Sequence, residues 1–302
     1  MIKLLNGDCL ELMKNIPTGS VDMILCDLPY GTVKGLHIDG WKTKTTDWDN
    51  TINTELLFKE YERVLRCNGV AILFSQEPYT SHLRTFECEN FEFLYPLIWK
   101  KNHFANCLSC NKAPVSYFED LSVFSKKYDK QNLHPLREYF KNVLDFLNFK
   151  SCNEINKVLK NRKSEHTFYI NSTQFSLCTN EVYNELIDKL HIDKMKGFKT
   201  YRELEELNKT FKRTFNLQDN SKIMSNVLEF KKEYKRYHPT QKPVELLEYL
   251  IKTYTNENDL VLDNCMGSGS TGVACKNLNR NFIGIELDKN YFEIAKKRID
   301  TL

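Results

Sequence analysis

Short apolar runs alternate with amphipathic helical patterns at both ends of this chain of 302 residues. Apolar runs predict strands at 2–5, 21–26, 70–74, 91–99, 119–124, 259–263 and 282–286. Apolar spacing and capping residues predict helices over 9–15, from Thr54 to before Asn68, over 79–87, from Pro243, from the glycine-rich turn to about 278, and after Asp288. Strands that alternate with helices predict an α/β fold, with a mostly parallel sheet covered on both faces.

The segment 126–236 has a different pattern, because it lacks buried-strand runs and is predicted to be mostly helical, over 136–147, 152–160 and 181–190. It holds 23 Lys and Arg against 15 Asp and Glu, whereas the rest of the chain holds 20 against 25. A basic segment in an acidic body indicates a part that binds a polyanion, although a solvated helical surface has the same composition. We therefore divide the chain into 1–125, 126–236 and 237–302.

Two short helices are predicted on either side of residues 161–164, within the basic segment. Their spacing is that of a helix-turn-helix, a pattern that also occurs in helical domains that do not read DNA. The sequence leaves both interpretations open.

Composition excludes several classes of protein. No stretch approaches the roughly 20 apolar residues of a membrane span, and the first residues become polar too soon for a signal peptide, so we expect a cytoplasmic protein. Ten Cys indicate reduced thiols and no disulfide framework. Cys107 and Cys110 have the spacing of half a zinc site, but no second close pair accompanies them, so we expect an ordinary loop and no metal.

The strand at 21–26 ends at a turn, Asp27-Leu28-Pro29-Tyr30-Gly31, which carries candidate chemistry. Asp27 offers a carboxylate, Leu28 a carbonyl that the following proline keeps out of a helix, and Tyr30 a flat face with a polar tip. Such groups could hold a planar ring with an exocyclic amine, whereas the alternative is a turn that only ends the strand. The polar stretch 32–50 that follows is typical of a lid, a binding loop or a mobile connection.

A glycine motif near the end of the chain indicates a nucleotide-type cofactor. Residues 267–272 satisfy the pattern G-x-G-x-x-G, and Glu286 ends the next strand, where dinucleotide folds place a ribose-binding acid. Glu286 could instead be a solvated strand end. A nicotinamide-binding unit needs further strand–helix repeats after Glu286, yet the pattern leaves room for one helix. The missing strands must be those at the front of the chain, which gives one Rossmann-like sheet in circularly permuted order.

Three motifs resemble those of the beta-class DNA amino-methyltransferases, which use S-adenosylmethionine (SAM) to methylate adenine N6 or cytosine N4. The turn at Asp27 resembles D/N/S-P-P-Y with Leu28 in place of the first Pro, and residues 238–243 match H-P-T-Q-K-P. Residues 261–271 resemble the D-P-F-x-G-S-G-T-T turn, with Asn264 and Cys265 in place of Pro and Phe, and we expect the second change to loosen packing around the cofactor. The motif order is that of the beta class, and the resemblance covers about two thirds of the chain.

The resemblance implies that 1–125 is the catalytic part, 237–302 the SAM-binding part, and 126–236 an inserted target-recognition domain that binds double-stranded DNA. It assigns catalysis to Asp27, Leu28, Pro29 and Tyr30. The implied SAM-binding residues are Asp8, Thr240, Gln241, Lys242, Asp263, Cys265, Gly267, Gly269, Ser270, Thr271 and Glu286. Asp263 could instead only cap the turn. Trp99 and Phe118 are candidates for the wall of a base pocket, with core packing as the alternative.

The resemblance predicts methyl transfer to adenine N6 after the base has flipped out of the duplex. Asp27 and the Leu28 carbonyl would accept the two N–H bonds of the amine, and Tyr30 would stack on the base. Adenine is favoured because Asp at position 27 resembles the adenine subset, whereas Ser is commoner among cytosine N4 enzymes. Cytosine N4 methylation is the alternative, and a catalytically inactive DNA-binding protein of the same fold is less favoured because the motif keeps its Asp, Pro and Tyr.

Two other methyltransferase classes are set aside. Cytosine C5 chemistry needs a Cys nucleophile that follows a Pro in that family, and none of the eight Pro here precedes a Cys. Protein glutamine methyltransferases carry their glycine motif before the N-P-P-Y turn, which is the opposite order. The beta class includes homodimers and partners of cognate restriction endonucleases, and the sequence carries no mark that decides either relationship.

Overall fold

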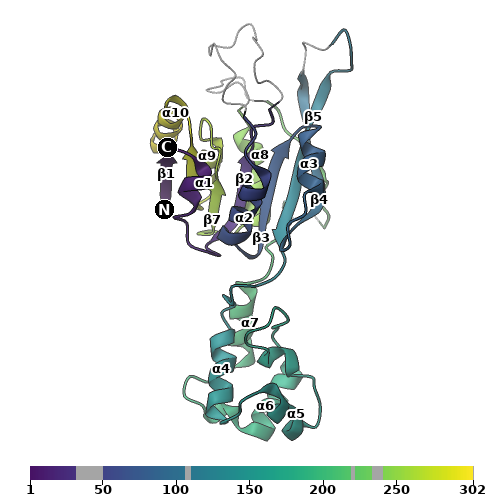
Figure 1. Ribbon diagram of the computed structural model, residues 1–302, viewed down its shortest axis with the longest axis vertical. Helices are drawn as coiled ribbons and strands as arrows, with labels where there is room; N and C mark the ends of the chain where they lie inside the picture. Colours follow the sequence, from purple (N-terminus) through teal and green to yellow (C-terminus); the bar gives the residue numbers. More distant parts are fainter. Residues whose placement is uncertain (32–49, 106–109, 219–221, 233–240, 302) are drawn as a thin grey trace. The chain divides into compact units, whose positions relative to one another are not determined.

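Eight strands form one sheet in the computed structural model, which describes residues 1–31, 50–105, 110–218, 222–232 and 241–301 (Figure 1). The strands are β1 (Ile2–Asn6), β2 (Val21–Asp27), β3 (Leu65–Ser75), β4 (Phe91–Ala105), β5 (Ser116–Lys126), β6 (Val227–Glu229), β7 (Leu260–Asp263) and β8 (Asn281–Glu286). Their order across the sheet is β1-β8-β7-β2-β3-β5-β4-β6. All pairs are parallel except those of β5, which runs antiparallel to β3 and β4. Strand β2, from the first part of the chain, therefore pairs with β7, from the last part. This is the circularly permuted order that the sequence predicts.

The chain separates into two compact units, each with a hydrophobic core of its own. The first is Met1–Lys127 together with Arg213–Leu302, and the second is Tyr128–Lys212. The second unit is shorter than the expected segment 126–236, because β6 pairs with β4 and so belongs to the sheet. Arg213 Nη2 donates to Ser125 Oγ at 3.1 Å, so the chain enters the first unit again beside the end of β5, where it left.

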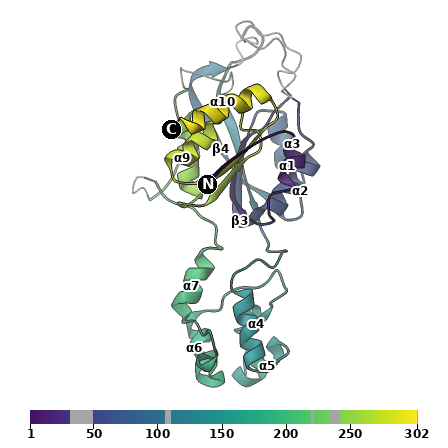
Figure 2. The ribbon, with the colours of Figure 1, turned by 90° about the vertical axis from the view of Figure 1, so that its left-hand side faces the viewer.

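Helices cover both faces of the sheet (Figures 1 and 2). One face carries α1 (Cys9–Met13), α2 (Thr54–Val64) and α3 (Tyr79–Thr85), and the other carries α8 (Val244–Tyr254), α9 (Ser270–Asn277) and α10 (Lys289–Asp300). Side chains of β2 alternate between these two layers, because successive strand residues point to opposite faces. Met23 and Leu25 join the core with α8, whereas Ile24 and Cys26 join the core with α1 and α2. The next residue on the α8 face is Asp27.

The second unit is helical and packs around buried apolar residues. Its helices are α4 (Arg137–Phe146), α5 (Cys152–Leu159), α6 (Asn180–Leu190) and α7 (Tyr201–Lys209), with 3₁₀ turns η2 (Glu165–Phe168) and η3 (Ile192–Lys194). Of the two interpretations left open for residues 151–169, the structure favours the ordinary helical one, because the second short helix is η2, a single 3₁₀ turn of four residues that is too short for a recognition helix. The unit holds 15 Lys and Arg against 12 Asp and Glu, since much of the basic excess of 126–236 lies outside it.

The carboxyl ends of the parallel strands lie along one edge of the sheet, together with the start of the antiparallel β5. This edge carries Asp27, Asp263 and Glu286 at the ends of β2, β7 and β8. Ligands of α/β sheets bind outside the carboxyl ends of the strands, where neighbouring connections leave in opposite directions. The fold therefore places the predicted site at this edge. No described helix has the length and apolar content that crossing a bilayer would need.

Candidate active site

Asp27 is held by contacts to both of its carboxylate oxygens. The Tyr30 hydroxyl donates to Oδ1, and Lys242 Nζ donates to Oδ2 at 2.6 Å. Lys242 comes just before α8, the helix that covers this face of the sheet, and its side chain is 6% exposed. The ammonium also lies 5.1 Å from the ring centre of Phe74 and 5.9 Å from that of Tyr30. The motif 238–243, which we expected to bind the cofactor, therefore also reaches the catalytic turn.

Two further charged residues, Glu119 and Lys101, join Lys242 and Asp27 in one cluster of charges, and neither was predicted from the sequence. Lys242 Nζ lies 3.1 Å from Glu119 Oε2, and Lys101 Nζ donates to Glu119 Oε1. Glu119 and Lys101 lie on β5 and β4, and Lys101 is two residues beyond Trp99, the cross-strand partner of Glu119. All these side chains point to the α8 face, because Trp99, Leu97 and Leu121 of the same alternation belong to that core. The result is an alternating row of charges: Lys101, Glu119, Lys242 and Asp27.

Each charged group in this row shifts the pKa of its neighbours. Burial raises the pKa of Asp27, the Lys242 ammonium opposes this rise, and the Glu119 carboxylate adds to it. Burial also acts to raise the pKa of Glu119, but the ammonium groups of Lys242 and Lys101 outweigh it and hold that pKa below its usual value. For Lys242, burial acts to lower the pKa and the two carboxylates outweigh it. Burial lowers the pKa of Lys101 in spite of Glu119.

The other residues of the catalytic turn have separate roles. Burial and the neighbouring Asp27 carboxylate raise the pKa of Tyr30 well above its usual value, so its hydroxyl stays a donor. The Leu28 side chain is 2% exposed and packs in the core of the α1 and α2 face. Because that side chain anchors the turn through apolar contacts, it can replace the proline of the family motif.

The glycine turn sits beside Glu286. Glu286 Oε2 accepts from Gly267 N at 2.8 Å, and Oε1 accepts from Asp288 N at 2.8 Å. Gly267 has φ +51°, and a Cβ built there would meet nothing within 4 Å. Gly269 has φ +79°, but a Cβ there would lie 2.9 Å from Ala295 Cβ of α10. Gly267 therefore leaves open space of the kind that a cofactor needs, whereas Gly269 lets α10 pack closely.

This difference between the two glycines predicts different effects of alanine. Gly267→Ala should cost about 1 kcal/mol of folding free energy from backbone strain alone and should weaken SAM binding. Gly269→Ala should cost about 2–4 kcal/mol, because strain is combined with a collision in a packed helix pair. Thermal unfolding and SAM titration of both variants check this, and a larger stability loss for Gly267→Ala would contradict it.

Both carboxylate oxygens of Asp263 accept hydrogen bonds from the segment that follows it. Its Oδ2 accepts from Thr271 Oγ1 at 2.6 Å and its Oδ1 from Cys265 N at 3.1 Å. The residue is 3% exposed, and burial raises its pKa to about 7. These contacts are those of the capping alternative, and they fix the path of the chain into α9.

Asn264 and Cys265, which depart from the family motif, are bonded to their surroundings. Asn264 Oδ1 accepts from the Tyr61 hydroxyl at 2.6 Å, and its Nδ2 donates to the sulfurs of Cys9 and Cys265 at 3.6 and 3.5 Å. Asn264 is 2% exposed. These polar contacts tie α1, α2 and the turn after β7 together where the family has Pro and Phe.

Residues from the motif 238–243 and from α10 also reach the glycine turn. Gln241 Oε1 accepts from Ser268 Oγ at 3.3 Å, whereas Thr240 lies outside the described residues. Arg298 Nη1 donates to the Ser268 carbonyl at 2.7 Å and lies 3.3 Å from Ser270 Oγ. No sequence motif marked Arg298, which comes from the last helix.

The remaining predicted residues make no hydrogen bond to Asp27 in the described part of the chain, although the Lys101 ammonium lies 5.1 Å from the ring centre of Trp99. Asp8 is exposed and caps α1 through Leu10 N at 2.8 Å, at the end of β1 beside the end of β8. Trp99 is 2% exposed in the core, and its Nε1 donates to the Phe230 carbonyl at 2.9 Å. Phe118 is 47% exposed, and strand alternation points it away from the face of Glu119. The stretch 32–50 and the pair Cys107 and Cys110 fall largely outside the described residues.

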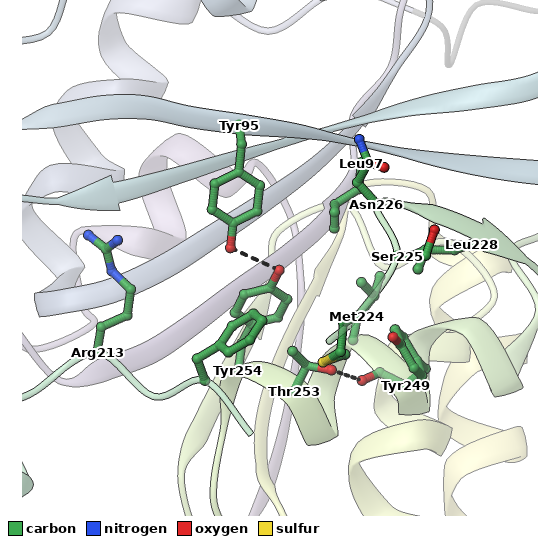
Figure 3. Close-up of a pocket in the computed structure, with 12 residues that line it drawn as sticks. Tyr95, Leu97, Arg213, Met224, Ser225, Asn226, Leu228, Tyr249, Thr253 and Tyr254 are labelled. Carbon is green, nitrogen blue, oxygen red and sulfur yellow. Dashed lines mark hydrogen bonds between the residues drawn. The ribbon is translucent and has the colours of Figure 1, made fainter. Parts of the chain in front are cut away.

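A cavity of about 370 Å³ lies between β4, α8 and the segment before β6 (Figure 3). Its lining residues are Tyr95, Leu97, Arg213, Phe215, Met224, Ser225, Asn226, Leu228, Tyr249, Leu250, Thr253 and Tyr254. The hydroxyls of Tyr95 and Tyr254 are 3.1 Å apart across it. None of the predicted site residues lines this cavity.

The sequence model of the family described as DNA methylase, the N6 and N4 methyltransferases, matches residues 21–297. The chain belongs to this family. Type II methyltransferase M2.LlaDCHI of Lactococcus lactis subsp. cremoris is 26% identical over 98% of the chain and 88% of its own length. DNA adenine methyltransferase YhdJ of Escherichia coli K12 is 26% identical over 98% and 82%. The crystal structure of the M1.HpyAVI–SAM complex is 25% identical, with a TM-score of 0.56 over 99% of this chain and 100% of that one.

These comparisons confirm the expected fold class and the expected activity. The chain is a SAM-dependent DNA methyltransferase with a Rossmann-like sheet, and DNA is its substrate. The open space beside Gly267 and the carboxylate of Glu286 fit a cofactor with an adenosyl group. The roles of individual residues are a separate question.

Proposed function

We propose that this DNA methyltransferase modifies the N6 amine of adenine, with Asp27 as the group that holds the amine. The observation that carries this proposal is the position of Asp27, a partly buried carboxylate at the carboxyl edge of the sheet that already accepts a hydrogen bond from an ammonium group at 2.6 Å. An amine N–H would meet the same acceptor. The family includes adenine N6 and cytosine N4 enzymes, and the similarity to YhdJ, a DNA adenine methyltransferase, supports adenine.

The chemistry follows from the electronic structure of the amine. Its lone pair is delocalised into the ring, which makes it a poor nucleophile. Asp27 and the Leu28 carbonyl accept the two N–H bonds and favour a pyramidal nitrogen whose lone pair is free to react. Tyr30 stacks on the flipped base and keeps its hydroxyl on Asp27. The cofactor would supply an activated methyl group on a sulfonium sulfur. The amine nitrogen would form its new bond to the methyl carbon as the sulfur–carbon bond breaks and that electron pair stays on sulfur, and the proton that the nitrogen then loses would leave by way of the Asp27 carboxylate.

Glu286 and the glycine turn would hold the cofactor, with Gly267 giving its backbone room to approach. Lys242 faces Asp27 and Glu119, so its proposed contribution moves from the cofactor to the amine site. Sequencing of single DNA molecules from cells that express the protein tests the proposal. We expect one short sequence to carry modified adenine, and unmodified DNA in cells that express Asp27→Ala. Modified cytosine would favour the N4 alternative.

We also propose that the helical unit Tyr128–Lys212 contributes target recognition, as expected of the inserted domain. The chain leaves the first unit after Lys127 and enters it again at Arg213, which bonds Ser125 near the end of β5, so a short Gly-Ser linker can replace the helical unit without loss of β6. The shortened protein should keep SAM affinity within about threefold and lose at least about tenfold in affinity for target DNA. Unchanged binding in a filter assay would contradict the assignment. A homodimer, a cognate restriction endonuclease and a cytoplasmic location stay predictions.

A further inference from the structure

The proposed acceptor of the target amine is already bonded to one of the protein's own side chains. Lys242 Nζ lies 2.6 Å from Asp27 Oδ2, an oxygen of the carboxylate that the proposed function assigns to the target amine. An ammonium group and an exocyclic amine both offer N–H donors, and the ammonium is further held over the rings of Phe74 and Tyr30. A base that enters must compete with this charge-assisted hydrogen bond, which is about twice as strong as a neutral one.

Glu119 provides a second position for the same ammonium. Its Oε2 is buried and lies 3.1 Å from Lys242 Nζ, so the ammonium is already paired with both carboxylates and makes its shorter contact with Asp27. A small rotation of the lysine towards Glu119 would shorten this second contact and lengthen the first. Lys101 holds the other oxygen of Glu119, which keeps that carboxylate in place and ionised.

We infer that Lys242 exchanges between the two carboxylates when the target base binds. With no base present, Lys242 makes its shorter bond to Asp27 and keeps that partly buried carboxylate paired. When the amine reaches Asp27, the ammonium shifts to Glu119 Oε2 and leaves an oxygen of Asp27 to the substrate, so no buried charge is left unpaired. The shift also moves a positive charge away from the nitrogen that becomes positive during transfer. Glu119 is thus a positioning residue for base capture, and this inference rests on the proposed function.

Two DNA duplexes measure the contribution of the amine. Both contain the target sequence found by sequencing, and in one the target adenine is replaced by purine, which lacks the 6-amino group. The measured ratio is the dissociation constant of the purine duplex divided by that of the adenine duplex, with saturating S-adenosylhomocysteine at pH 8.5. A larger ratio means that the site binds the amine more tightly. Glu119→Gln should lower this ratio by on the order of tenfold, because Lys242 then stays on Asp27. The double variant Glu119→Gln/Lys242→Met should restore most of it.

Loss of structure would not give this pattern, since a second substitution in a loosened site would not restore the ratio. Glu92→Gln is the matched control, because Glu92 pairs with Lys127 at 3.1 Å on the same pair of strands, away from the site. A ratio unchanged in Glu119→Gln, or not restored in the double variant, would overturn the exchange. A wild-type protein that binds both duplexes equally would contradict the proposed role of Asp27 instead.

Discussion

Replacement of Asp27 by alanine should abolish methyl transfer, with a loss of at least about a thousandfold in turnover, while SAM affinity changes within about threefold. The carboxylate is the charged acceptor at the proposed amine site, and Lys242, Tyr30 and Glu119 are arranged around it. The hydrogen bonds that hold Glu286 and the start of the glycine turn run to Gly267, Asp288 and Asp263, and none of these three bonds involves Asp27. Transfer of a labelled methyl group to DNA and calorimetric titration with SAM measure the two effects separately.

Asp27→Asn and Glu11→Gln make the result specific. Asparagine keeps the shape of the side chain and removes its charge, so it should fall close to the alanine variant in rate. Glu11 is an exposed carboxylate that pairs with Lys14 on α1, and its change to glutamine should leave both measurements unaltered. Activity of Asp27→Ala near that of the wild type would falsify the role given to this carboxylate.

Replacement of Lys242 by methionine should shift the pH profile of methyl transfer to higher pH. Burial already raises the pKa of Asp27, and the Lys242 ammonium is the group that opposes this rise. Without it, and with Glu119 still charged nearby, the pKa of Asp27 should rise further, so a larger share of Asp27 is protonated at a given pH and no longer accepts the N–H bond of the amine as a carboxylate. At pH 7, the rate of methyl transfer should fall about tenfold for each unit by which the pKa of Asp27 exceeds 7. The rate should recover as the pH rises.

Lys100→Met is the control for this prediction, because Lys100 pairs with Glu229 on an exposed part of the same sheet. Its pH profile should match that of the wild type. If Lys242→Met lowered the rate equally at every pH and also weakened SAM binding, Lys242 would act at the cofactor, as the sequence motif first indicated.

The sequence predicted the sheet well because buried strands leave a strong apolar pattern. The strand at Asp27, the glycine turn and Glu286 could all be identified, since each combines an apolar run with residues that end it. Prediction was weaker where polar contacts decide the structure. Helix α2 begins at Thr54 as predicted, but the residue that caps it is Asn53, which accepts from Leu56 N at 3.0 Å and which the sequence did not single out. Helix α7 was missed because its charged residues hide the period, although Thr200 and Glu203 form a capping box.

Glu119 and Lys101 could not be found from the motifs, because neither belongs to one. Their proximity depends on the register of β4 and β5, which places Trp99 opposite Glu119 and depends on the irregular pairing of the whole hairpin. A charged residue at the start of an apolar strand usually faces solvent. In the sequence, Lys101 follows one predicted strand and Glu119 begins the next, so two opposite charges stand at neighbouring strand ends. The antiparallel pairing that brings them together is known only from the structure.

The identity of the base that receives the methyl group decides between adenine N6 and cytosine N4 methylation. DNA with known target sites can be incubated with the protein and SAM carrying a deuterated methyl group, then digested to nucleosides for mass spectrometry. We predict deuterium-labelled N6-methyldeoxyadenosine from the wild-type protein and none from Asp27→Ala. Labelled N4-methyldeoxycytidine, or label in DNA treated with Asp27→Ala, would contradict the account.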